Sequence, residues 1–116
     1  MTLIRAIYNQ CQNRVSIEKR TAMVDQRSRI GDWEIDTIIG AHHQEVLLSL
    51  VERKSRLCLV ARLVNKYAQE VERTTINLLN SIKEKVHTVT SDNGKEFVKH
   101  ESIAKNLDAK FFFAHP

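Results

Sequence analysis

Two aspartates of the 116-residue sequence stand where a carboxylate needs an explanation. Asp36 lies inside the apolar stretch Asp32–Ile39, where an ionised group is costly unless something compensates its charge. The β-branched run Val86–Thr90 continues directly into Ser91-Asp92-Asn93-Gly94. We therefore expect Asp92 at the carboxyl end of a strand, where the ligand sites of α/β sheets collect. If the two strands are neighbours, both carboxylates approach one point.

A divalent cation is the usual remedy for the repulsion between two adjacent carboxylates. Ligands that are all oxygen suit Mg²⁺ or Mn²⁺ rather than zinc. A structural interpretation stays open, because Asp92-Asn93-Gly94 is also an ordinary turn sequence and Asp36 is compatible with an edge strand facing water. Strand alternation puts Asp32, Glu34 and Asp36 on one face. Asp36 is the better ligand candidate, because it lies deepest among apolar neighbours.

Three consecutive strands are predicted in the part of the chain that carries Asp36. Residues 32–39 alternate with period two and end at Gly40, which indicates a strand. Two further apolar runs, Val46–Val51 and Leu57–Leu63, flank the polar connection Glu52–Arg56. This spacing suits an antiparallel hairpin.

Helices and strands alternate in the rest of the chain. Apolar residues recur at helical spacing from Ala68 to Ile82, and a second helical stretch covers about Lys95 to Asn106. The strands Val86–Thr90 and Lys110–Ala114 follow the two helices. The order β-β-β-α-β-α-β predicts an α/β fold of ribonuclease-H-like type, a mixed sheet with helices packed on it. We expect a core in residues 31–116, with Trp33, Phe97 and Phe111–Phe113 buried, and an extended or partly helical arm in residues 1–30.

The composition is that of one soluble globular domain, with 42% hydrophobic and 28% charged residues. The net charge of +4 suits a polyanionic partner such as nucleic acid. No apolar run approaches the ~20 residues of a bilayer span, so we expect no membrane partner. Cys11 and Cys58 give no disulfide framework and fit a reducing cytoplasm; we expect Cys58 in a partly buried strand.

Four strings of residues, in order, resemble the catalytic core of bacterial insertion-sequence transposases. The similarity is to the insertion-sequence-thirty family, within the retroviral-integrase-like superfamily, and it covers about Arg14 to Pro116. The strings are residues 14–20 continued by 25–40, residues 51–57, Ser91-Asp92-Asn93-Gly94-Lys95-Glu96-Phe97, and Phe113-Ala114-His115-Pro116.

The resemblance implies a function for the two aspartates. The family has a ribonuclease-H-like fold and an Asp, Asp, Glu triad that binds two Mg²⁺ ions, and by motif Asp36 matches the first acid and Asp92 the second. It implies phosphoryl transfer on DNA, with cleavage and joining of strands at transposon ends and target DNA in the bacterial cytoplasm. Asn93 and Lys95, beside Asp92, become candidate contacts to DNA phosphate, although Lys95 also fits a solvated first-turn residue.

The sequence departs from the family pattern in its third acid. That acid lies on a helix beyond the strand ending in Phe113-Ala114-His115-Pro116, and Glu96 and Glu101 come too early in the element order to replace it. The family's amino-terminal helix-turn-helix has no counterpart before Arg14. We therefore expect a segment from the middle of a transposase, truncated at both ends and inactive alone, with an apolar patch exposed around Phe111–Phe113.

Two other functions are compatible with the same sequence. The chain fits a non-catalytic remnant that binds DNA, a second copy of itself or a full-length transposase through its basic surface and an exposed sheet edge. It also fits, less well, a small α/β adaptor in which the aspartate pair is a coincidence. A downstream reading frame encoding the missing glutamate helix would separate a transposase fragment from a remnant.

Overall fold

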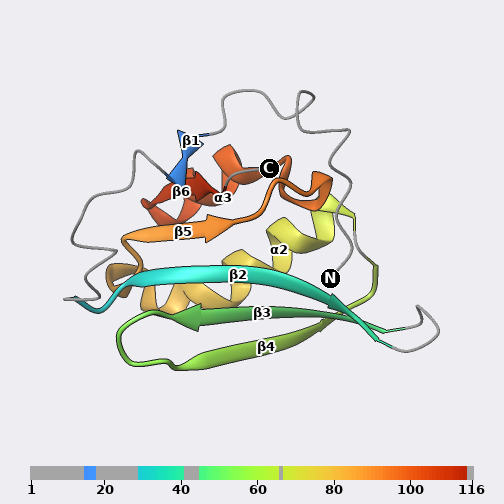
Figure 1. Cartoon of the computed structure of the whole chain (residues 1–116), viewed down its shortest axis with the longest axis horizontal. Coiled ribbons are helices and arrows are strands. Elements are labelled where there is room, and N and C mark those ends of the chain that lie inside the picture. Colours follow the sequence, from blue (N-terminus) through green and yellow to red (C-terminus); the bar gives the residue numbers. More distant parts are fainter. Residues whose placement is uncertain (1–14, 18–28, 41–44, 66, 115–116) are drawn as a thin grey trace.

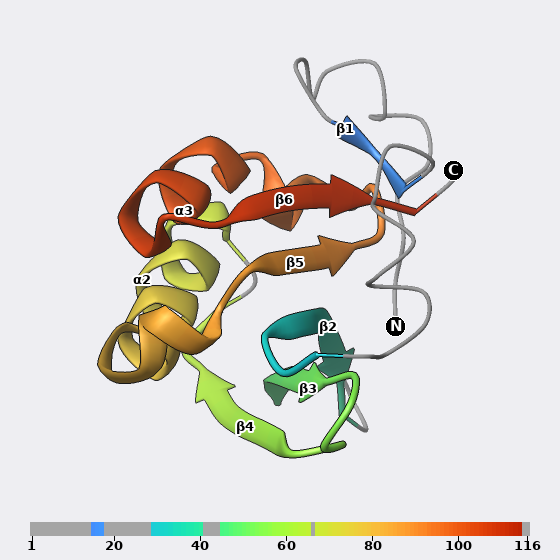
Figure 2. The same cartoon turned by 90° about the vertical axis from the view of Figure 1, so that its left-hand side faces the viewer.

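In the part of the chain that the structure describes, six strands form a mixed sheet in the order β1-β6-β5-β2-β3-β4, and the helices lie on one of its faces (Figures 1 and 2). The computed structural model describes residues 15–17, 29–40, 45–65 and 67–114. The strands are β1 (Val15–Ser16), β2 (Asp32–Ile39), β3 (Val46–Glu52), β4 (Cys58–Leu63), β5 (Thr88–Ser91) and β6 (Lys110–Phe113). The helices are α2 (Ala68–Leu79) and α3 (His100–Leu107), with the 3₁₀ helices η4 (Asn80–Lys85) and η5 (Lys95–Phe97).

The predicted order of strands and helices is confirmed, with three differences of detail. The first helical stretch ends as α-helix at Leu79 and continues as the 3₁₀ helix η4, which is kinked at Ile82. The second stretch divides into η5 and α3. Within the predicted arm, Val15–Ser16 forms β1, which pairs in parallel with β6. Residues 1–14 and 18–28 of that arm lie outside the described residues.

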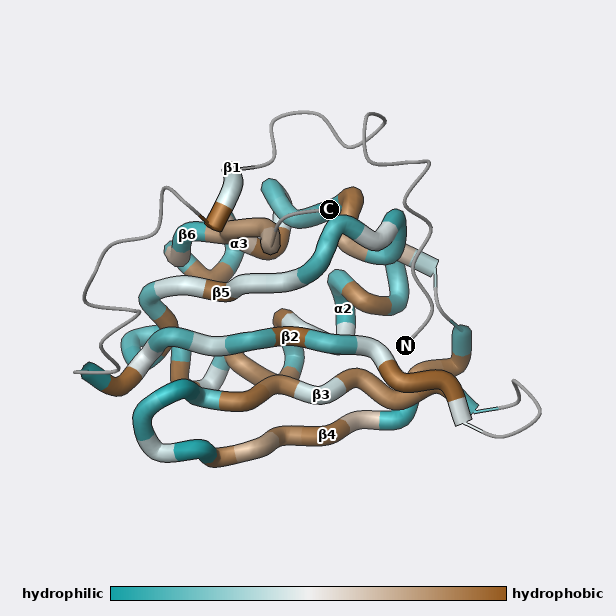
Figure 3. Tube along the Cα trace, viewed as in Figure 1, coloured by the Kyte–Doolittle hydropathy of each residue, from teal (hydrophilic) through white to brown (hydrophobic). Residues whose placement is uncertain are grey.

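The core lies between the helices and one face of the sheet. Alternate residues of the strands and every third or fourth residue of the helices are buried there, as their periods require. Its members include Trp33, Ile35, Leu48, Leu50, Val71, Leu79, Val89, Phe97, Ile103 and Leu107. Along β2, polar and apolar residues interleave, whereas β4 is largely hydrophobic (Figure 3). None of the helices in the described ranges is long and apolar enough to cross a membrane.

One expectation about exposure, the apolar patch around Phe111–Phe113, is wrong. Phe111 and Phe113 are 5% and 2% exposed, because the His100 ring on α3 packs against both, at centroid distances of 5.9 and 5.0 Å. Phe112, between them, is also 5% exposed, so no apolar patch opens at β6. The strand that carries Cys58, β4, is partly buried as expected, and Cys58 itself is exposed at the start of this edge strand.

The parallel pairing of β2 with β5 begins at Gly31. The Gly31 carbonyl accepts hydrogen bonds from the backbone N–H of His87 at 2.6 Å and of Thr88 at 3.1 Å. Gly31 has a φ of 122°, a conformation that residues with a side chain rarely adopt. A Cβ there would also lie 2.9 Å from the Lys85 carbonyl oxygen. Glycine at this position therefore allows β2 to start in register with β5.

The side chain of Glu52, at the end of β3, binds the backbone at the start of β2. Its carboxylate, 1% exposed, accepts hydrogen bonds from the backbone N–H of Gly31 at 3.0 Å, Lys54 at 3.0 Å and Ser55 at 2.6 Å. Burial alone would raise the pKa of Glu52, but the hydrogen bonds from Ser55, Gly31 and Lys54 outweigh it and lower the pKa from 4.5 to about 2. The charged form therefore stabilises the turn and the start of β2.

We predict that Glu52→Gln destabilises the fold in a pH-dependent way. A carboxyl whose pKa is depressed in the folded state contributes its full stability above its unfolded pKa, and that contribution is lost as the pH falls toward the folded pKa. The free energy of unfolding should fall by roughly 3 kcal/mol at pH 7, and the difference should narrow between about pH 5 and pH 2. Urea denaturation measures this, with the exposed Glu84→Gln as control. A difference that does not change with pH would contradict the prediction.

Candidate active site

Asp36 and Asp92 occupy equivalent places on neighbouring parallel strands. The pairing of β2 with β5 ends at Glu34 and Thr90. Asp36 lies two residues after Glu34, and Asp92 lies two residues after Thr90. Both are partly buried. Adjacent strands run about 4.8 Å apart, and β2 and β5 lie side by side with their carboxyl ends in the same direction (Figure 1). The two strands are therefore neighbours, which is the condition that a shared site for the two aspartates requires.

The other two acidic residues on this face of β2 are held in ion pairs. Asp32 is 1% exposed, and the Arg29 guanidinium donates to both of its carboxylate oxygens, at 3.0 and 3.1 Å. Glu34 pairs with Arg53 across to the β3–β4 turn. The Asp36 carboxylate accepts a hydrogen bond from the backbone N–H of the next residue at 2.9 Å. These ion pairs disfavour Asp32 and Glu34 as ligands, and the prediction for Asp36 rests on its place beside the end of β5.

The segment after Asp92 is a turn as well as a candidate site. The Gly94 N–H donates to Asp92 Oδ1 at 2.9 Å, the local hydrogen bond that Asp makes in such turns. A Cβ on Gly94 would overlap Glu96 Oε1 and would lie 3.0 Å from Asp92 Oδ1. Glycine therefore leaves room for the carboxylates of Glu96 and Asp92, which both approach the position that a Cβ would occupy.

Glu96 is a buried acid whose contact the sequence analysis did not anticipate. Its side chain is 3% exposed, and its Oε2 accepts a hydrogen bond from Thr37 Oγ1 at 2.7 Å. The sequence feature that could have indicated this contact is Thr37. It is a polar residue on the apolar face of a strand, and its buried hydroxyl group requires an acceptor. Within the ranges that the structure describes, no three His, Cys, Asp or Glu side chains group so as to hold a metal ion. Glu96 therefore does not complete a three-carboxylate cluster there.

The two candidate DNA contacts differ in position. Asn93 is 3% exposed, and its Nδ2 donates to the Ala114 carbonyl at 2.5 Å, which ties the turn after β5 to the end of β6. Lys95 is exposed at the first position of η5. Cys11 and His115, two residues named in the sequence analysis, lie outside the described residues.

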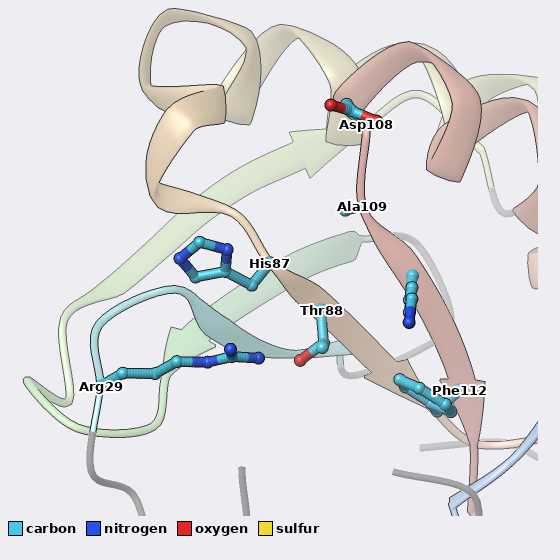
Figure 4. A pocket seen from close by; sticks show the side chains of 7 residues that line it. Arg29, His87, Thr88, Asp108, Ala109 and Phe112 are labelled. Atoms are coloured by element: carbon cyan, nitrogen blue, oxygen red, sulfur yellow. The ribbon is translucent and has the colours of Figure 1, made fainter. Parts of the chain in front are cut away.

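A separate hollow of about 330 Å³ lies at the amino ends of β5 and β6 (Figure 4). Its lining mixes charges, with Arg29, His87, Lys110 and Asp108 among its residues. Arg29 already pairs with Asp32. Because Asp92 follows the opposite, carboxyl end of β5, this hollow is not part of the candidate site.

The fold is that of a retroviral integrase catalytic core. The chain is similar to the catalytic core domain of BIV integrase with a TM-score of 0.63 and 23% sequence identity, over 73% of this chain and 55% of that one. The fold class is therefore ribonuclease-H-like, as the order of elements predicted. At that identity the similarity establishes the fold alone.

Sequence similarity places the chain within a family. It is 42% identical over 89% of its length to the transposase for insertion sequence element IS4351 of Bacteroides fragilis. It is 28% identical over 90% of its length to the transposase InsI for insertion sequence element IS30A of Escherichia coli. The chain belongs to the IS30-related transposase sequences. It spans about a third of the length of these relatives, 32% and 27% respectively. No protein-family model matches it.

We predict that Asn93→Ala destabilises the fold, whereas the neighbouring Lys95→Ala does not. Removing the amide leaves the Ala114 carbonyl without this donor, which costs about 1–3 kcal/mol for a buried group. The exposed Lys95→Ala should change the free energy of unfolding by no more than about 0.5 kcal/mol. Urea denaturation of the two variants measures the difference. Equal stabilities would show that the Asn93 amide does not hold the turn to β6.

Proposed function

We propose that this chain is a catalytic-core segment of a DNA transposase, in which Asp36 and Asp92 serve phosphoryl transfer on DNA. One observation carries the proposal: both aspartates follow the last paired residues of adjacent parallel strands by two positions. Support comes from the relatives, which are named as transposases for insertion sequence elements. DNA at the element's ends and at the target is the proposed substrate.

The donor set at this place fits Mg²⁺ or Mn²⁺. It consists of the carboxylates of Asp36 and Asp92, and hard divalent cations prefer such oxygen ligands. Asp36 and Asp92 would hold the ion, and water or DNA phosphate oxygens would fill the remaining positions. When bound, it would lower the pKa of the attacking hydroxyl group and stabilise charge on the leaving oxygen.

The chain's own residues orient the two acids before any ion binds. The Thr37 N–H donates to Asp36 Oδ1, and the Gly94 N–H donates to Asp92 Oδ1, both at 2.9 Å. Each carboxylate is thereby oriented by the backbone of a sheet or its turn, so that little ordering is left for the moment of reaction. Positioning is the main task of a protein in phosphoryl transfer.

The exposed ammonium of Lys95 is the proposed contact to DNA phosphate near these acids. The amide of Asn93 already donates to Ala114 and is buried, so we assign Asn93 a structural part in the turn. The formal net charge of +4 adds a general attraction to a polyanion.

The alternative function, a module that binds a second chain without chemistry, has one observation in its favour. β4 is an edge strand of the described sheet, and Leu57, Val60 and Val64 on or beside it are 51%, 56% and 84% exposed. An apolar strand edge can pair with another chain. This alternative predicts that Asp36→Asn and Asp92→Asn leave every measurable property unchanged except local stability.

We predict weak binding of Mn²⁺ that depends on both aspartates. Two carboxylates leave most of the coordination shell to water, so the affinity should be low. Asp36→Asn and Asp92→Asn should each weaken it at least about tenfold, since each removes one of two charged ligands. Isothermal titration calorimetry measures the affinities. The control is Asp108→Asn, an exposed aspartate beside the amino end of β6. Equal affinities in all four proteins would exclude a shared site.

We predict that these 116 residues alone bind DNA but do not cut it. The affinity should decrease steeply as salt rises, because Lys and Arg neutralise phosphates and release counterions. Cleavage should be absent, because the 116 residues lack the third acid of the family's triad, and loss of one member of a catalytic set usually eliminates most of the rate. The assay incubates the chain with insertion-sequence end DNA and Mn²⁺, beside a version extended after β6 by a helix that bears the third acid. Cleavage by the 116-residue chain that disappears in Asp92→Asn would contradict the prediction.

A further inference from the structure

Thr37 and Glu96 join β2 to the turn after β5 just where the backbone pairing of the two strands has ended. The last paired residues are Glu34 and Thr90. Beyond them, Thr37 Oγ1 donates to Glu96 Oε2 at 2.7 Å, and both side chains are buried, at 0% and 3% exposure. This hydrogen bond crosses between the strand of Asp36 and the segment that follows Asp92.

The bond lies on the opposite face of β2 from Asp36. Trp33, Ile35 and Thr37 alternate with the acidic residues of β2 and are buried on the side of the core. Glu96 belongs to η5, which contacts α2 and so lies on the helix side of the sheet. A carboxylate in this place supports the strand from behind and does not join Asp36 on its own face.

Glu96 also approaches the backbone that orients Asp92. A Cβ on Gly94 would overlap Glu96 Oε1, so the Glu96 carboxylate rests against the Gly94 α-carbon. The N–H of Gly94 donates to Asp92 Oδ1, and the N–H of Thr37 donates to Asp36 Oδ1. One path of contacts therefore runs from Asp36 through Thr37, Glu96 and Gly94 to Asp92.

We propose that Glu96 is a positioning residue that, through Thr37 and Gly94, sets the separation and orientation of Asp36 and Asp92. This inference rests on the function proposed above for the two aspartates. It assigns Glu96 a role distinct from the third acid of a metal site. A carboxylate suits the role because a charged acceptor makes a shorter and stronger hydrogen bond to a hydroxyl than a neutral one.

The test compares Mn²⁺ affinity, by calorimetry, in a set of matched variants. Thr37→Val and Glu96→Ala each break the bond and should weaken Mn²⁺ binding about 10-fold or more, in the range found for groups that orient metal ligands. The double variant should be no weaker than either single variant, because both remove the same interaction. Thr37→Ser and Glu96→Gln keep a donor and an acceptor and should stay within about threefold of the wild type. Glu52→Gln controls for lost stability, since it acts at the other end of β2.

A second readout needs no metal. Hydrogen exchange of the Thr37 and Gly94 amides reports the two hydrogen bonds that orient the aspartates. In Thr37→Val, protection of the Gly94 amide, which lies in a different segment from the substitution, should fall at least about tenfold relative to amides of β3.

The outcomes separate the two proposals. Wild-type affinity in Thr37→Val and Glu96→Ala, with loss in Asp36→Asn and Asp92→Asn, overturns the role of Glu96 and leaves the proposed function intact. A loss in Glu96→Gln as large as in Asp92→Asn, with Thr37→Val unaffected, makes Glu96 a direct ligand and also overturns it. If Asp36→Asn binds Mn²⁺ like the wild type, the proposed function fails. The hydrogen-exchange result does not depend on metal binding. Unchanged protection of the Gly94 amide in Thr37→Val overturns the positioning role of Glu96, whatever the Mn²⁺ affinities are.

Discussion

The parallel pairing of β2 with β5 is the constraint on which the candidate site depends. Asp36 and Asp92 belong to segments more than fifty residues apart in sequence, and only the register of these two strands brings them to equivalent places. A slip of one residue would turn every side chain of β2 to the other face. The register is held at its start, where the Gly31 carbonyl accepts two backbone N–H groups and Thr88 Oγ1 donates to Asp32 at 2.8 Å.

Acidic side chains lie at both ends of the paired segment of β2 and β5, and they differ in burial between the two ends. At the amino end of β2, Asp32 and Glu52 are almost fully buried, and the guanidinium of Arg29 or several backbone N–H groups compensate their charges. Removing a partner of such a carboxylate would leave its charge buried without compensation, which is strongly destabilising. At the other end, Asp36 and Asp92 are only partly buried, so that solvent and a ligand can reach them. The difference in exposure separates structural acids from candidate catalytic ones.

Local patterns in the sequence were sufficient to predict the strands and helices and their order. The alternation along β2, the polar hairpin turn after β3 and the helical spacing of α2 each reflect a period that the sequence carries directly. Contacts between distant segments were not predictable in this way. The burial of Phe111 and Phe113 depends on the ring of His100, and the position of Asn93 depends on the carbonyl of Ala114. Each of these pairings is visible only once the chain has folded.

Glu96 illustrates why the candidate site was predictable only in part. Element order predicts that Glu96 is not the third acid of the related family, yet the local sequence did not indicate which residue the buried Glu96 would contact. Its partner Thr37 is one residue from Asp36, and alternation sends these two neighbours to opposite faces of β2. Asp36 therefore faces away from the core, whereas its supporting residues Thr37 and Glu96 are buried on the core side of β2. Because adjacent residues of a strand move together, packing on the helix face of β2 restricts where Asp36 can lie on the other.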